Sequence, residues 1–267
     1  MAKITKISTQ KRAGRYNLEL DGRFAFGISE NVLAKFGLMK GRELDEGTIE
    51  RIKEADKIDQ GLKVALNFLS PALRTEKQVR ERLLKKEIDP KVIDPVVDYL
   101  KEQQLLSDAT YAKAYVNTKQ VFTPKGPRAI FMDLKKAGVK EEYIEDALVE
   151  YSEESQLEVA TKMAEKMART HKRDSTRTRQ QKTAQGLVQK GFSLEIASRA
   201  INNIDIASDE EDEKDNALRE AEKAARRQRT GTAKEKFFKV KSKLYAKGFS
   251  GEIIEWALEQ IDFGEDE

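Results

Sequence analysis

Cysteine is absent from this 267-residue sequence, and histidine occurs only once. The lack of cysteine excludes disulfides, thiolate catalysis and cysteine-ligated zinc or iron–sulfur clusters, and it is consistent with a cytoplasmic protein. The single histidine, His171, lies in a basic run, which is typical of a surface residue. No GxxxxGK[ST] loop, no GxGxxG motif after a strand and no nucleophile–base pair stands out. We therefore expect a protein that is not an enzyme and that holds no cofactor or metal.

Long apolar runs are also missing. No run approaches the roughly 20 residues that a membrane-spanning helix needs, and the N-terminus MAKITKIS lacks the apolar core of a signal peptide. Hydrophobic residues make up 39% of the chain and charged residues 36%, which suits an elongated protein better than one compact globule. The net charge is only +3, so an anion-binding site would need local clustering of charge. Without a long heptad seam, we expect a soluble, cytoplasmic monomer.

The first residues differ in pattern from the rest. Ile4–Ser8 and Tyr16–Leu20 are short β-like runs. The Asp-Gly pair at 21–22 stands between alternating apolar residues and predicts a hairpin, because both turn positions favour positive φ. Residues 29–36 predict a short helix with Ser29 as its N-cap.

From about Glu46 the helical period takes over, and an internal repeat appears. Each copy has an amphipathic segment, then a helix anchored by a leucine, then a further helix. The anchors are Leu83, Leu134, Leu187 and Leu244. The residues four positions later are Glu87, Gly138, Gly191 and Gly248. Glycine just past a helix end enters the left-handed conformation at the least steric cost, so the turn at Glu87 should be more strained than the others or differently shaped.

The predicted fold class is therefore mainly α, an elongated array of four three-helix repeats with a small N-terminal β element. The expected domains are residues 1–45 for the hairpin and short helix, then 46–102, 103–152, 153–206 and 207–267 for the four repeats. The acidic run 208–215 is a candidate for a flexible joint between the last two repeats. Pro71, Pro90 and Pro95 should lie near helix starts, where proline is tolerated.

Basic residues recur around the junction between the first and second helices of each repeat. If the repeats stack, these junctions would form one basic stripe for a polyanion or an acidic protein groove; the simpler alternative is a solvated helix face. The candidate partner-binding residues are Arg80, Lys119, Lys125, Arg128, Lys135, Arg177, Arg179 and Lys182. Phe237, Phe238 and Tyr245 interleave with the repeat-four cluster, and core packing is the favoured interpretation over base stacking.

Repeat two carries a resemblance to a known family. Its segments LLSDATYA (105–112), KGPRAI (125–130) and LKKAGV (134–139) resemble the signature of the RecX family of regulatory proteins. Residues 65–70, 79–86 and 92–100 resemble the first repeat of that family, and the length and N-terminal β extension resemble the long form of low-GC Gram-positive bacteria. The chain departs from the family pattern at Ser107, where an acid is usual, and at Glu87, where glycine is usual.

The resemblance implies a regulator of the RecA recombinase. RecX-like proteins bind RecA–DNA filaments, are thought to lie in the helical groove, and inhibit strand exchange, ATP hydrolysis and coprotease function. The implied role is in recombination, DNA repair and the SOS response, and the candidate stripe would contact RecA, single- or double-stranded DNA, or both. Two alternatives stay open: a helical-repeat protein that binds DNA independently of RecA, and a scaffold for some other protein.

Overall fold

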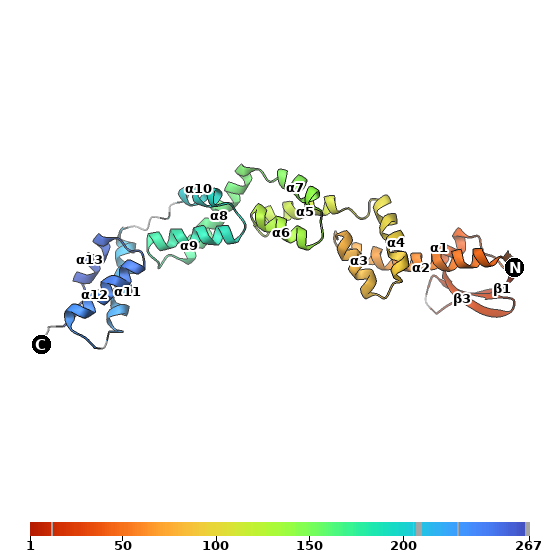
Figure 1. Ribbon diagram of the computed structural model, residues 1–267, viewed down its shortest axis with the longest axis horizontal. Coiled ribbons are helices and arrows are strands. Elements are labelled where there is room, and N and C mark those ends of the chain that lie inside the picture. The colour runs from red at the N-terminus through yellow and green to blue at the C-terminus, as the bar shows by residue number, and fades with distance from the viewer. Residues whose placement is uncertain (12, 205, 207–209, 229, 265–267) are drawn as a thin grey trace. The chain divides into compact units, whose positions relative to one another are not determined.

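The computed structural model describes residues 1–11, 13–204, 206, 210–228 and 230–264 (Figure 1). The chain forms two compact units, one made of Met1–Ala114 with Leu134–Glu145 and the other of Tyr115–Asp133 with Asp146–Glu267. The described residues form a four-stranded sheet at the N-terminus and helices in groups of three after it. The predicted class, mainly α with three-helix repeats and a small β element, is confirmed. Within the described ranges no helix is long and apolar enough to cross a membrane.

The N-terminal sheet is antiparallel, with the strand order β3-β2-β1-β4. Its strands are β1 (Ala2–Thr9), β2 (Arg15–Leu20), β3 (Arg23–Ser29) and β4 (Glu43–Leu44). The predicted hairpin is confirmed, because Leu20 pairs with Arg23 across a two-residue turn whose Asp21 and Gly22 have φ values of 49° and 81°. The sequence did not predict β4, whose two residues are too few to show an alternating pattern.

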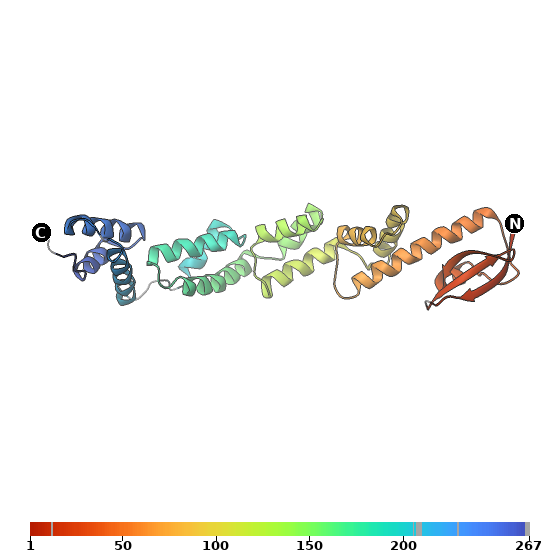
Figure 2. The ribbon, with the colours of Figure 1, turned by 90° about the horizontal axis from the view of Figure 1, so that it is seen from below.

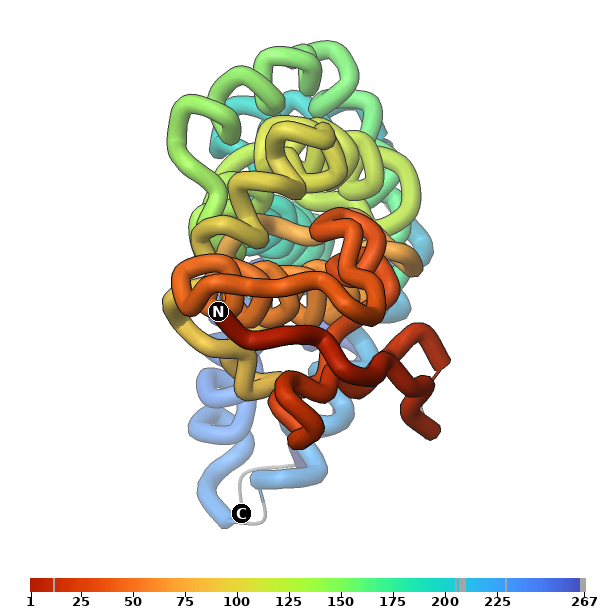
Figure 3. Tube along the Cα trace, turned by 90° about the vertical axis from the view of Figure 1, so that its right-hand side faces the viewer, coloured from red at the N-terminus to blue at the C-terminus, as the bar shows by residue number. Residues whose placement is uncertain are grey.

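Helix α1 (Glu30–Lys35) begins at the predicted N-cap, since the Ser29 hydroxyl accepts a hydrogen bond from the Val32 amide. Helix α2 (Glu46–Leu69) then serves two cores. Ile52, in its first half, is buried with the sheet residues, whereas Ala65, in its second half, is buried with the first repeat. Figures 2 and 3 show the strands beside the first half of this helix.

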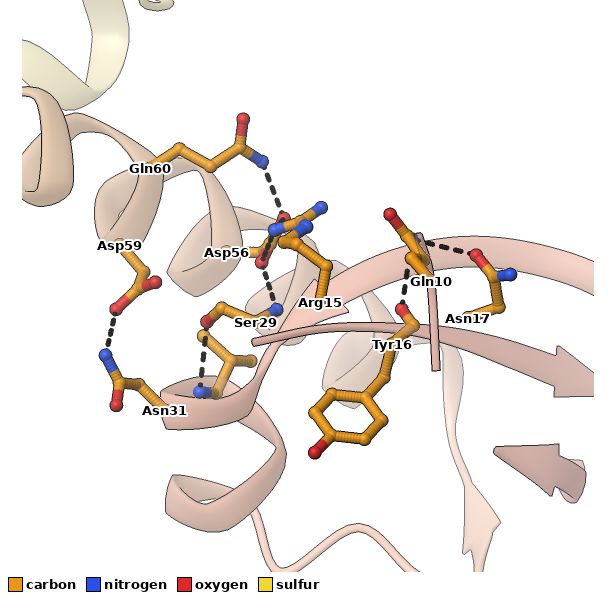
Figure 4. Close-up of polar contacts among 10 residues, drawn as sticks. Gln10, Arg15, Tyr16, Asn17, Ser29, Asn31, Asp56, Asp59 and Gln60 are labelled. Atoms are coloured by element: carbon orange, nitrogen blue, oxygen red, sulfur yellow. Dashed lines mark hydrogen bonds and ion pairs between the residues drawn. The ribbon is translucent and has the colours of Figure 1, made fainter. Parts of the chain in front are cut away.

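A buried ion pair fixes the sheet to α2 (Figure 4). Asp56 is 5% exposed, and its carboxylate accepts from Arg15 Nη1 at 2.6 and 2.9 Å, from the Ser29 amide at 2.7 Å and from Gln60 Nε2 at 2.7 Å. Arg15 lies on β2 and Ser29 ends β3, so one carboxylate holds two strands. Removing one partner of such a buried pair leaves an uncompensated charge and costs about 3–5 kcal/mol.

The remaining helices group into repeats, each with a first, a middle and a third helix. Repeat one is α2, α3 (Glu76–Lys85) and α4 (Pro90–Glu102), and repeat two is α5 (Asp108–Val121), α6 (Pro127–Lys136) and α7 (Glu141–Val149). Repeat three is α8 (Glu153–Thr170), α9 (Thr176–Gln189) and α10 (Leu194–Asn202), and repeat four is α11 (Glu210–Ala225), α12 (Ala233–Ala246) and α13 (Gly251–Glu259).

The same turn joins the middle and third helices in all of these repeats. The anchor leucines are fully buried, and their carbonyls accept from the amides of Ile88, Val139, Phe192 and Phe249 at 3.1–3.3 Å. This is the six-to-one bond of the Schellman motif, which needs a left-handed residue just before the donor. That residue has φ of 89°, 94° and 82° at Gly138, Gly191 and Gly248, and 57° at Glu87. Of the two predicted alternatives at Glu87, a different shape is therefore wrong, and the turn instead holds a non-glycine residue in the left-handed region.

Two local predictions were wrong. Pro90 is the first residue of α4, as expected, but Pro95 lies inside the same helix and Pro71 follows the end of α2. The missing hydrogen bond at Pro95 is offset by the burial of its neighbours Val96 and Val97. The acidic run at 208–215 is not simply a joint: positions 208 and 209 lie outside the described residues, and residues 210–215 form the first turns of α11.

Candidate partner interface

The sequence sets where each middle helix begins. Thr75, Ser175 and Thr232 are N-caps whose hydroxyls accept from a backbone amide three residues later, at 3.2 Å in each case. Such caps stabilise a helix start by about 1 kcal/mol. In repeat two the middle helix instead starts with Pro127, whose fixed φ suits the first helical position.

The start of one middle helix binds the end of the next. The Thr75 hydroxyl donates to the Ala137 carbonyl at 2.7 Å, and the Ser175 hydroxyl donates to the Lys247 carbonyl at 2.6 Å. Between repeats two and three, the Gly126 amide donates to the Lys190 carbonyl at 2.8 Å. Each acceptor immediately precedes the left-handed glycine of the following repeat. We call these contacts the junctions of repeats one–two, two–three and three–four.

An acid from the next repeat's first helix completes two of the junctions. Asp108 accepts from the Glu76 amide at 2.8 Å, and Glu213 accepts from the Thr176 amide at 3.2 Å. Burial raises the pKa of Asp108, and the hydrogen bond from the Glu76 amide only partly opposes that rise. A negative side chain fits a helix start, where unpaired amides carry partial positive charge.

The junctions leave no room for a side chain at their glycines. A Cβ atom built on Gly126 would lie 2.2 Å from the Gly191 carbonyl carbon, and one on Gly191 would lie 2.4 Å from the Ala129 nitrogen. At Gly248 it would lie 3.0 Å from the Ser175 hydroxyl oxygen. Gly191 is therefore required by the neighbouring repeat as well as by its left-handed turn, and Gly126 by the neighbouring repeat alone. At Gly248 a side chain would strain the left-handed turn and would need a small shift of Ser175.

A cation occupies the second position of each middle helix, at Lys77, Arg128, Arg177 and Lys234. A positive charge in the first turn opposes the helix dipole and costs about 0.3–1 kcal/mol. Lys77 Nζ donates to the Lys136 carbonyl at the end of α6, at 3.1 Å. Arg128 and Arg177 are exposed, and among the described residues neither makes an ion pair or a side-chain hydrogen bond. An unfavourable charge that recurs in this way indicates a role beyond the helix itself.

Arg80, the first of the eight predicted residues, supports its own repeat. Its guanidinium binds Glu76 at 2.8 Å and Asp94 at 2.6 Å, which raises the pKa of Arg80. Burial opposes ionisation of Glu76, but hydrogen bonds from Lys101 and Arg80 outweigh it and lower the pKa of that carboxyl. Arg80 therefore joins α3 to α4.

Lys119 and Lys125 hold the loop between α5 and α6. Lys125 Nζ lies 2.5 Å from Asp133 Oδ2, and Lys119 donates to the Thr123 hydroxyl at 2.7 Å and lies 5.1 Å from the centre of the Tyr115 ring. Burial opposes ionisation of Asp133, but hydrogen bonds from Lys125 and Tyr115 outweigh it and lower its pKa. Both lysines are thus occupied within repeat two.

Three more predicted residues have local partners as well. Lys135 pairs with Glu141, Arg179 donates to the Ile206 carbonyl, and Lys182 pairs with Asp174 at 2.7 Å. Of the predicted set, Arg128 and Arg177 are the two without such contacts in the described part of the chain. Lys77 and Lys234 belong to the basic stretches of the sequence but were left out of the predicted set, although their place two residues after an N-cap was readable.

The prediction of core packing for the aromatic residues of α12 is confirmed for Phe237 and is wrong for Phe238 and Tyr245. Phe237 packs against the repeat-four core, but Phe238 is 54% exposed and Tyr245 is 72% exposed. Both exposed rings lie on the same helix as Lys234, one near its start and one near its end.

A broad cleft of about 1290 Å³ lies in the first compact unit, beside the Arg15–Asp56 pair. Its lining includes Arg15, Lys35, Glu54 and Lys63. Because cations and anions line it together, it does not favour one ligand charge. No group of three or more His, Cys, Asp or Glu side chains in the described residues is placed to hold a metal ion.

Comparison with known proteins agrees with this architecture. Residues 2–45 match the model of the regulatory protein RecX N-terminal domain, and residues 62–100, 107–148 and 153–201 match those of the RecX first, second and third three-helix domains. A RecX regulatory protein of Leuconostoc mesenteroides is 47% identical over the full length of both chains, and one of Bacillus subtilis is 39% identical over 97% of this chain and 99% of its own.

Two crystal structures are also similar. One is of a regulatory protein RecX, 40% identical, with a TM-score of 0.67 over 76% of this chain and all of that one. The other is of RecX from Lactobacillus salivarius, 37% identical, with a TM-score of 0.54 over 57% of this chain and 99% of that one. These relatives are regulatory proteins, so the prediction of a non-enzymatic protein is confirmed. The chain belongs to the RecX family of regulatory proteins.

Proposed function

We propose that this protein binds filaments of the RecA recombinase and lowers their activity in recombination, DNA repair and the SOS response. The observation that carries the proposal is the cation at the second position of each middle helix, kept against the helix dipole. Its recurrence provides similar contact points at regular intervals along the chain. Membership of the RecX family supports RecA as the partner.

Repeated contact points suit a partner that is itself repetitive. A RecA filament presents the same surface on successive protomers, so each repeat of this protein would meet an equivalent site. Contacts that are weak singly act together when one chain carries them, because the first contact raises the effective concentration of the next. The protein would act in this way as a cytoplasmic monomer.

The direct test is RecA ATP hydrolysis on single-stranded DNA while the protein is titrated in. We expect inhibition well below one molecule per RecA protomer, since one chain would contact several protomers. Unchanged hydrolysis together with salt-sensitive DNA binding would favour the alternative, a DNA-binding repeat protein that is independent of RecA. Unchanged hydrolysis without DNA binding would leave only a scaffold for another protein.

A double variant tests the surface. Arg128→Glu with Arg177→Glu reverses the two predicted cations that make no contact of their own, so it should weaken inhibition by about tenfold, or roughly 1.4 kcal/mol of binding. The matched control is Lys166→Glu, which reverses an exposed cation on α8 away from any helix start. Lys125 is not suitable for this purpose, because its reversal would place a glutamate beside Asp133. Equal inhibition by both variants and the wild type would mean that this surface is not used.

A further inference from the structure

Two positions of the repeats meet across the start of the middle helix. One is the residue two places before that helix, and the other is the seventh residue within it. In repeat two these positions hold Lys125 and Asp133, whose Nζ and Oδ2 atoms lie 2.5 Å apart. In repeat three they hold Asp174 and Lys182, which pair at 2.7 Å. Each of these repeats therefore closes the site with one cation and one aspartate, although the two charges stand in the opposite order.

Repeat one has arginine at both positions, Arg74 and Arg82. Both guanidinium groups lie against the ring of Phe68 near the end of α2, with their Cζ atoms 4.7 and 5.4 Å from the ring centre. In the described part of the chain, neither side chain makes an ion pair or a hydrogen bond, and the Nε atom of each is enclosed without a partner. Repeat one thus holds two like charges where repeats two and three hold a neutral pair.

Stacking on Phe68 fixes the two arginines but does not use their donors. A cation attracts the face of an aromatic ring, which engages the flat side of the guanidinium group. The five N–H donors of each group lie in its plane and point away from it at the edges. Two like charges beside one ring also repel each other, and an anion between them would remove that repulsion. The cluster of Phe68, Arg74 and Arg82 is therefore a site that is fixed in place and lacks one anion.

We propose that Arg74 and Arg82 bind the carboxylate of an acidic side chain on the partner protein. Guanidinium groups bind carboxylates and phosphates alike, so the choice rests on the equivalent positions of repeats two and three. There the group that meets the cation is the carboxylate of Asp133 or Asp174. The partner would supply to repeat one the acid that those repeats carry themselves.

The site follows from the chain's own ion pairs, and only the identification of its partner as RecA rests on the proposed function. A phosphate of the DNA backbone is the competing occupant. The experiments below therefore measure binding to RecA filaments and to DNA separately, and one of them uses neither.

The first test is the affinity of the full-length protein for RecA filaments on single-stranded DNA. Arg82→Asp copies the arrangement of repeat two, so the new carboxylate would pair with Arg74 and fill the site from within. We expect filament binding at least tenfold weaker, with an unchanged or raised melting temperature. Arg74→Asp copies repeat three and should have the same effect, which guards against a folding defect in the first variant. The matched control is Lys166→Glu, an equal change of charge at an exposed position on α8, which should weaken binding less than twofold.

Binding to single-stranded DNA without RecA identifies the anion. A carboxylate site predicts that Arg82→Asp and Lys166→Glu bind this DNA equally well. A tenfold loss of DNA binding in Arg82→Asp alone would make the occupant a phosphate and overturn the proposal.

A soluble acidic peptide, hexaglutamate, tests the site without RecA or DNA. Enclosure of the Nε atoms of Arg74 and Arg82 slows exchange of their hydrogens with water, so NMR can follow these N–H groups. We expect the peptide to shift both signals in the wild type and to leave the Arg74 signal unmoved in Arg82→Asp.

The outcomes separate this inference from the proposed function. If the wild type binds RecA filaments and Arg82→Asp binds them as well as Lys166→Glu does, the site is wrong and the proposed function stands. If the wild type does not bind RecA filaments, the proposed function is wrong and the peptide decides the site. Shifts of both arginine signals would then support a site for an acidic side chain, and unmoved signals would overturn it.

Discussion

The turn of repeat one and the turns of the later repeats share a backbone shape but differ in the residue that adopts it. Glu87 has φ of 57°, and its counterparts Gly138, Gly191 and Gly248 have φ between 82° and 94°. Each glycine packs against the preceding repeat, whereas no junction formed by the described residues covers Glu87. The comparison teaches that a left-handed turn alone tolerates another residue at some cost, and that close docking of a neighbour makes glycine necessary.

The largest effect should come from adding a side chain to a docked turn. Gly191→Ala introduces a Cβ atom 2.4 Å from the Ala129 backbone nitrogen and forces alanine into a left-handed conformation. Together these should lower the free energy of unfolding by about 2–4 kcal/mol. Urea unfolding of the full-length protein measures this loss of free energy of unfolding. A loss below about 0.5 kcal/mol would mean that the junction is looser than its distances indicate.

Two matched N-cap variants measure what a junction adds. Thr75→Val removes both the cap of α3 and the bond to Ala137, whereas Thr232→Val removes only the cap of α12. We expect losses of about 2 and 1 kcal/mol in the free energy of unfolding. The difference, about 1 kcal/mol, is the contribution of the junction hydrogen bond. Equal losses in urea unfolding would show that the bond to Ala137 does not stabilise the fold.

A buried hydroxyl in repeat three can be compared with aliphatic residues at the same place elsewhere. Thr183 is fully buried, and its hydroxyl has no partner in the described structure, while Val79, Ile130 and Val240 occupy the equivalent positions. Thr183→Val should therefore raise the free energy of unfolding by about 1 kcal/mol. Thermal unfolding would detect it as an increased melting temperature. Destabilisation would show that the hydroxyl finds a partner in solution.

The smallest effect is expected at the uncovered turn. Glu87→Gly relieves the left-handed strain but frees the unfolded chain, so the net gain should be no more than about 0.5–1 kcal/mol. Urea unfolding measures both variants, and the change in the free energy of unfolding for Glu87→Gly should have the opposite sign to that for Gly191→Ala. A loss of stability at Glu87→Gly would mean that the glutamate side chain makes a stabilising contact.

Much of the fold was readable from local pattern. The hairpin followed from one Asp-Gly pair, and the repeats followed from four leucines with a turn residue at a fixed spacing. The double role of α2 was not readable, because apolar periodicity does not say which half of a helix meets which core. Pro95 was misplaced for a similar reason: burial of its neighbours outweighs a local rule.

The candidate site was readable only in part. Sequence reveals that cations cluster at helix junctions, but which of them are already paired depends on acids that approach in space. Asp94 lies 14 residues after Arg80 and accepts a hydrogen bond from its guanidinium. Asp133 lies 8 residues after Lys125 and accepts a hydrogen bond from its ammonium group. The second-position cations carry the clearer signal, since they conflict with the dipole of their own helix.

The most direct measurement is hydrogen exchange of the full-length protein with and without RecA filaments on single-stranded DNA. Each middle helix carries a cation at its second position, and among the described residues Arg128 on α6 and Arg177 on α9 are exposed and make no ion pair or side-chain hydrogen bond. The account predicts that RecA slows exchange in the first turns of α6 and α9. Unchanged exchange at both helix starts, or protection confined to the N-terminal strands, would contradict it.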